Sequence, residues 1–146
     1  MSDVARRVVP AMLLGRVLAF SLPATTLPVI MRCCRVASTT FDAVDVIDAI
    51  RAVERVWRVM PRGSGTCLTR SVWRVFAGRR AGLPLQFVIG VRLTSTKQLE
   101  AHAWLELKGA LFMEGNAQTP VGFTRLFEHP STSASSAPVP AELRFG

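Results

Sequence analysis

The chain has 146 residues, of which 49% are hydrophobic, so it has the length for one domain with a buried core and hardly for two. Its net charge of +8 comes almost entirely from arginines dispersed along the chain. Such a surface attracts acidic partners, but no basic stripe interleaved with aromatic residues marks a nucleic-acid-binding module, and we expect no nucleic-acid partner.

The cysteines are Cys33, Cys34 and Cys67. An odd number with two adjacent argues against a disulfide framework and for a reducing, cytoplasmic compartment. No cysteine and histidine occur at zinc-ligand spacing, so neither a structural metal nor any other cofactor is expected.

Residues 1–40 are predicted to form an N-terminal helical segment. The apolar stretch at 8–31 is long enough to span a bilayer, but Arg16 and three prolines make a spanning helix unfavourable. Two short helices broken near Pro23, packed on the domain or on a partner, fit better. A signal peptide and peripheral membrane contact through residues 8–31 remain alternatives.

Residues 41–129 are predicted to form the main domain. Apolar residues at three- and four-residue spacing predict a helix over about 41–59, with Thr39 and Asp42 as a capping box. A Gly/Ser-rich break at 61–65 follows. A second helix should begin at Thr66 or Cys67, with Ser64 or Thr66 as its cap, and end before Gly82.

Alternating residues then predict strands at 85–93, 101–107 and 110–114. Helices followed by consecutive strands indicate an α+β fold with a small antiparallel sheet. The Ser/Ala/Pro-rich residues 130–146 are predicted to be a disordered tail.

Cys67 and His102 are the residues most suited to nucleophilic catalysis. A cysteine in the first turn of a helix has its thiolate stabilised by the positive helix end, and a histidine can act as its base. Either residue alone is more often structural. A helix that begins at Cys67 and packs on a sheet bearing His102 would bring them together.

The register of the last hairpin decides whether His102 has an acidic partner. A two-residue loop, Lys108-Gly109, would place Glu114 opposite Ala103 on the wrong face. A three-residue loop, residues 107–109, would place Glu114 opposite His102. We expect the second register, with Gly109 in the left-handed conformation.

Blocks at 67–71, 88–92 and 101–106, with a Gly82-containing turn between the first two, resemble the transglutaminase-like leader peptidases of lasso-peptide biosynthesis. The resemblance covers about residues 60–116. It implies a transglutaminase-like, papain-like core and removal of the leader from a ribosomally made precursor peptide by a Cys-His-Asp triad.

The residue at the position of the family's aspartate is Glu114, so the implied triad is Cys67, His102 and Glu114. Asn116 is the fallback for orienting the histidine. Arg70 and Trp104 are candidates for substrate binding. The Cys67 backbone N–H would bind the oxyanion, with a second donor not identified.

The resemblance also bears on partners. The family includes longer proteins with a fused leader-binding domain, and roughly 40 residues before the main domain are too few for one. The split form is therefore expected, with a separate leader-recognition protein and an ATP-dependent macrolactam-forming cyclase as partners. Two alternatives stay open: a transglutaminase-like acyltransferase with the same triad, and a basic binding module in which Cys67 and His102 are structural.

Overall fold

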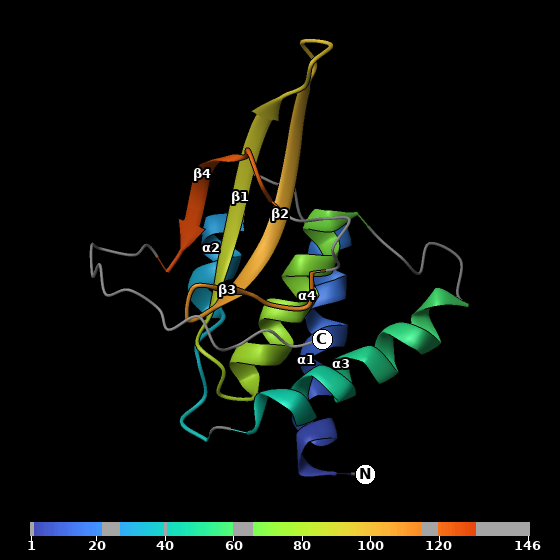
Figure 1. Ribbon diagram of the computed structural model, residues 1–146. Helices are drawn as coiled ribbons and strands as arrows, with labels where there is room; N and C mark the ends of the chain where they lie inside the picture. The colour runs from blue at the N-terminus through green and yellow to red at the C-terminus, as the bar shows by residue number, and fades with distance from the viewer. Residues whose placement is uncertain (1, 22–26, 40, 60–65, 115–119, 131–146) are drawn as a thin grey trace.

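The computed structural model describes residues 2–21, 27–39, 41–59, 66–114 and 120–130. Of the predicted tail at 130–146 they include only Pro130, and the predicted break at 61–65 lies outside them. The elements, shown in Figure 1, are α1 (Asp3–Ser21), α2 (Leu27–Cys33), α3 (Ala43–Arg58), α4 (Cys67–Arg80), β1 (Leu85–Leu93), β2 (Leu99–Leu107), β3 (Ala110–Leu111) and β4 (Thr124–His129).

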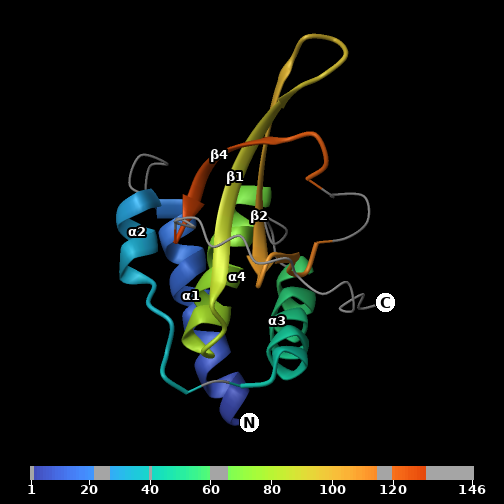
Figure 2. The same cartoon turned by 60° about the vertical axis from the view of Figure 1, so that its left-hand side comes forward.

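The four strands form one antiparallel sheet in the order β3-β2-β1-β4. Helix α4 lies between this sheet and α1, and α3 flanks the pair (Figures 1 and 2). The predicted α+β class is confirmed. The central position of α4 matters for function, because Cys67 is its first residue.

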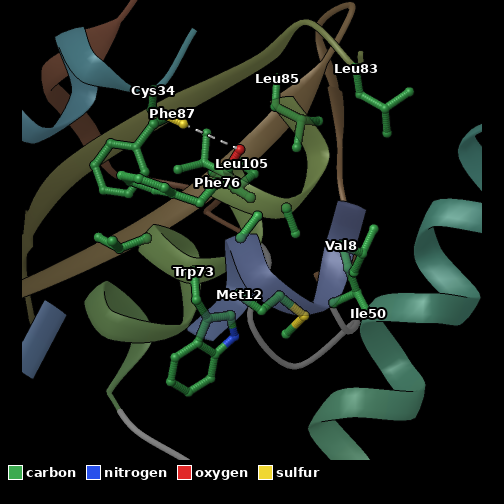
Figure 3. Close-up of a cluster of buried hydrophobic side chains, with 14 of the residues drawn as sticks. Val8, Met12, Cys34, Ile50, Trp73, Phe76, Leu83, Leu85, Phe87 and Leu105 are labelled. Carbon is green, nitrogen blue, oxygen red and sulfur yellow. Dashed lines mark hydrogen bonds between the residues drawn. The ribbon is translucent and has the colours of Figure 1, made fainter. Parts of the chain in front are cut away.

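The core lies between the sheet and the helices. The face of β1 with Phe87 and the face of β2 with Leu105 pack against α4, and α1 covers the far side of α4. Figure 3 shows this single cluster, including Val8, Met12, Ile50, Trp73, Phe76, Leu85, Phe87 and Leu105. Burying each such side chain contributes roughly 1.5–3 kcal/mol of transfer free energy, so the cluster fixes α4 on the sheet.

The N-terminal residues form two helices, as predicted, although α1 has 19 residues and continues through Pro10. Gly15 lets α1 approach α4 closely, because a Cβ there would lie 2.7 Å from the Cα of Trp73. Buried residues of both α1 and α2 belong to the same core cluster as the sheet. The predicted break at Pro23 lies outside the described residues, and no described helix has the length and apolarity to cross a membrane.

The two central helices match the sequence pattern, but one predicted cap is wrong. Asp42 itself caps α3, because its Oδ1 accepts a 2.8 Å bond from the Val44 N–H, whereas Thr39 accepts from Arg7. An acceptor adjacent to the helix satisfies its first N–H groups without the predicted Thr39 box. Thr66, one of the two predicted caps of α4, accepts a bond from the Thr69 N–H.

Strand β1 has the predicted bounds, and β2 begins two residues earlier than the predicted residue 101. The third strand, predicted at 110–114, ends at Leu111. The predicted three-residue loop is wrong: Leu107 pairs with Ala110, which leaves Lys108 and Gly109 as a two-residue turn. Both turn residues have positive φ, 51° and 81°, as the tightest hairpins require. Strand β4 was not predicted.

Candidate functional site

Cys67 occupies the first helical position of α4, and its side chain is half-buried. Thr66 caps the helix through the Thr69 N–H at 3.3 Å. The helix therefore begins in a fixed place, and its first N–H groups and positive end surround the residue that carries the thiol. Such N–H groups can bind an oxyanion formed beside Cys67.

His102 lies on β2 directly opposite Gly90 of β1. It belongs to the sheet face that turns away from the core, where its ring stacks on Trp104 at a centroid distance of 6.0 Å. The Phe123 ring lies 5.7 Å away on the same face. The His102 side chain is only 14% exposed, so aromatic packing holds the imidazole in a fixed and largely dry position.

Helix α4 is hydrogen-bonded to the outer edge of β2 at the residue that follows this histidine. The edge is paired as far as Leu105, whose carbonyl accepts from the Phe112 N–H at 2.9 Å, but β3 ends there. The next outward carbonyl, that of Ala103, instead accepts a 3.0 Å bond from the Ser71 hydroxyl of α4. Ser71 is one helical turn after Cys67 and on the same helix face. The N-terminal end of α4 thus lies beside β2, as both ribbon views show (Figures 1 and 2).

Glu114 approaches His102 by a route other than the one predicted. The two-residue turn would place it on the opposite face if β3 continued, but the strand stops and Met113 adopts a positive φ of 59°. This bend turns the chain back toward β2, and Oε2 of Glu114 lies 3.9 Å from Nε2 of His102. That distance is an ion-pair contact, longer than a hydrogen bond.

A buried charge network lies behind Glu114. Arg74 of α4 donates to both Glu54 carboxylate oxygens of α3, at 2.7 Å and 3.0 Å, and its Nη1 lies 3.7 Å from Glu114 Oε1. Burial alone would raise the pKa of Glu54, but Arg74, the Trp73 N–H and Arg70 together hold it below its ordinary value. Burial raises the pKa of Glu114 above its ordinary value. The charges of Arg74 and Arg70 lower this pKa but offset the effect of burial only in part, and the charge of Glu54 raises it further.

The other predicted site residues have different surroundings. Arg70 is half-buried, three residues after Cys67, and its charge acts on Glu114. Trp104 is 2% exposed and donates to Glu106 at 2.9 Å, so in this structure it is a packing partner of His102. Glu106 also pairs with Arg125 at 2.6 Å. Asn116 lies outside the described residues.

Sequence reasoning missed four contributors to the site: Glu54, Ser71, Arg74 and Phe123. Ser71 and Arg74 follow Cys67 by four and seven residues, and this spacing puts all three on one face of α4. That regularity was available in the sequence. Glu54 and Phe123 come from segments remote in sequence, and no local pattern marks them.

The described residues contain no group of three side chains that could hold a metal ion. They place the Glu114 carboxylate beside the imidazole of His102, and they anchor α4, which begins at Cys67, on the carbonyl of Ala103, the residue after His102. The chemistry available to this set is acyl transfer through a thiolate, with a histidine as base and an acid behind it.

A comparison with known protein families identifies the family of this chain. The family model described as "Transglutaminase-like superfamily" matches residues 10–128, which extend from within α1 to the last residue but one of β4. No curated protein and no solved structure matches the chain.

Proposed function

Because the chain belongs to the transglutaminase-like superfamily, whose members include cysteine peptidases and acyltransferases, we propose that it is a cysteine peptidase that removes the leader from a ribosomally made precursor peptide of the lasso type. One observation carries the proposal of a peptidase. Glu114 lies beside His102 at the β2 edge where Ser71 anchors the helix end that begins with Cys67.

The proposed mechanism uses these three residues together. Nε2 of His102 faces Glu114, which leaves Nδ1 to take the proton from the Cys67 thiol. The thiolate attacks the carbonyl carbon at the leader–core junction, and the resulting tetrahedral intermediate breaks its C–N bond. The imidazolium returns the proton to the leaving amine. Water, deprotonated by His102, then hydrolyses the thioester and releases the leader carboxylate and free Cys67.

Glu114 and the helix end supply the electrostatics of this reaction. The carboxylate stabilises the imidazolium form of His102 and orients its ring. The 3.9 Å gap closes to hydrogen-bond length when the histidine becomes charged, since catalytic contacts tighten in the reacting complex. The Cys67 backbone N–H at the start of α4 binds the oxyanion, because it has no partner within the helix at this position.

The lasso-type substrate rests on the sequence blocks at 67–71, 88–92 and 101–106. They contribute Cys67, the Gly90 opposite His102, and His102 itself. The helices α1 and α2 are part of the domain core. As part of the proposal, a separate protein recognises the leader and the freed core peptide passes to a macrolactam-forming cyclase.

The test is cleavage of a leader–core precursor followed by mass spectrometry, with and without a leader-binding protein. We expect two products whose masses add up to that of the precursor plus one water, formed much faster when the leader-binding protein delivers the substrate. A labelled primary amine is added in a parallel reaction. Amine incorporation in place of the leader acid would identify an acyltransferase and overturn the peptidase assignment.

A further inference from the structure

We propose that Arg74 is the positioning residue of this site: anchored on Glu54, it holds the Glu114 carboxylate beside His102. The inference rests on the proposed thiol chemistry but not on the identity of the substrate. It assigns a role to a residue that touches neither the substrate nor the reacting atoms.

Three elements meet at this guanidinium. Its Nε and Nη2 donate to the two oxygens of Glu54 on α3, a bidentate pairing that fixes the plane of the group. The remaining nitrogen, Nη1, points to the segment after β3. It donates to the Met113 carbonyl at 3.1 Å and lies 3.7 Å from Glu114 Oε1.

The Met113 contact explains how the bend is maintained. A positive φ of 59° is unfavourable for a residue with a side chain, and the surroundings must compensate for it. The bond from Arg74 to the Met113 carbonyl does so at the residue that redirects the chain toward His102. Loss of that bond would remove one interaction that keeps Glu114 close to β2.

The charge of Arg74 also acts directly on Glu114. The Arg74 side chain is 9% exposed and that of Glu114 3%, so their charges act with little screening by water. The charged groups that face Glu114 are Arg74 and Arg70 from α4, Glu54 from α3 and, when protonated, His102 from β2. Removing the Arg74 charge must therefore raise the pKa of Glu114, and removing the Glu54 charge must lower it.

Loss of the Arg74 charge and loss of the Glu54 charge should shift the pKa of Glu114 in opposite directions. A purely structural role of Arg74 would not produce such a readout. The rate of Cys67 alkylation by iodoacetamide, followed by peptide mass spectrometry as a function of pH, measures thiolate formation without any substrate. We expect Arg74→Gln to move the acid limb of this profile, the low-pH range over which the alkylation rate rises with pH, to higher pH by about one unit. Glu54→Gln, which keeps the shape of the side chain, should move it to lower pH. Arg74→Lys, with the charge but not the bidentate fork, should fall between Arg74→Gln and the wild type.

Matched controls remove similar charges from the exposed surfaces of the same helices. Asp48→Asn on α3 and Arg80→Gln on α4 should leave the limb unchanged. In a Glu114→Gln background, the shifts caused by Arg74→Gln and Glu54→Gln should vanish, because the group through which they act is gone. If Arg74→Gln does not fold, Arg74→Lys and Glu54→Gln still give the comparison.

Two results separate the possible failures. In the first, Cys67 is alkylated rapidly, but the acid limb does not move or moves in the same direction in Arg74→Gln and Glu54→Gln. This result would overturn the role of Arg74 and leave the proposed chemistry intact. Alkylation of wild-type Cys67 no faster than that of an unfolded cysteine peptide would overturn the thiol chemistry itself.

Discussion

Oε2 of Glu114 lies 3.9 Å from Nε2 of His102, although the hairpin register places no residue of β3 opposite that histidine. Two residues pair in β3, and Met113 then turns the chain back. The contact is thus made by a bend after the strand. Since Arg74 binds the carbonyl of the bending residue, the acid depends on α4 as much as on the sheet.

Substituting Glu114 by Gln should slow precursor cleavage roughly 10- to 100-fold without abolishing it. The amide keeps the size of the side chain but cannot stabilise an imidazolium by charge, and orienting groups contribute less than the nucleophile or base. Steady-state rates of the purified variant check this. Glu100→Gln, which removes an exposed carboxylate paired with Arg92 on the same sheet, should keep the wild-type rate. Equal rates for both variants would remove Glu114 from the mechanism.

Replacing His102 by Ala should reduce cleavage by at least about a thousandfold and slow alkylation of Cys67 at neutral pH. The base and the cation that stabilises the thiolate are both lost. The variant should remain folded by circular dichroism, because the imidazole packs on the face away from the main core. Normal alkylation kinetics in the His102→Ala variant would contradict the pairing of the two residues.

Gly90→Ala should lower both stability and activity. A Cβ at this position would lie 2.8 Å from Cη2 of Trp104, the ring that stacks on His102. Chemical denaturation measures the loss. Trp104→Phe removes the colliding atoms, so the double variant should lose less stability than the sum of the two single variants. Strictly additive losses would mean that the indole does not press against the β1 backbone.

Ser71→Ala should destabilise the fold by about 1–3 kcal/mol, because the buried Ala103 carbonyl loses its donor. Since this bond anchors the helix end that carries Cys67 to the edge of β2, kcat should fall more than stability alone explains. Denaturation and cleavage assays at a temperature where the variant is fully folded separate the two effects. A variant of unchanged kcat would show that the anchor is structural only.

Several helices and strands could be predicted from the local spacing of apolar residues. The alternation over Leu85–Leu93, whose Leu85 and Phe87 lie in the core, and the three- and four-residue spacing in α3 are strong signals of element type. The pattern also placed Cys67 at the start of α4, where a Gly/Ser-rich break precedes Thr66. Strand β4 escaped prediction because its residues are half-buried or exposed throughout, which gives no clean alternation.

The acidic side of the site could not be predicted in the same way. The register argument assumed that β3 would continue to Glu114, but a non-glycine residue with positive φ, Met113, ends it. That conformation depends on a contact from Arg74, and Arg74 in turn depends on Glu54 of a different helix. Such tertiary contacts leave no periodic trace in sequence.

The most direct measurement of the central claim is the rate of precursor cleavage by Cys67→Ala beside that by Cys34→Ala. Cys34 is buried near Val75 in the core, so its loss should change stability slightly and leave cleavage at the wild-type rate in the folded protein. Cys67→Ala should fold normally, since its side chain is only half-buried, and should lose at least about a thousandfold in rate. A Cys67→Ala variant that keeps a tenth or more of the wild-type rate would contradict the assignment of Cys67 as the nucleophile.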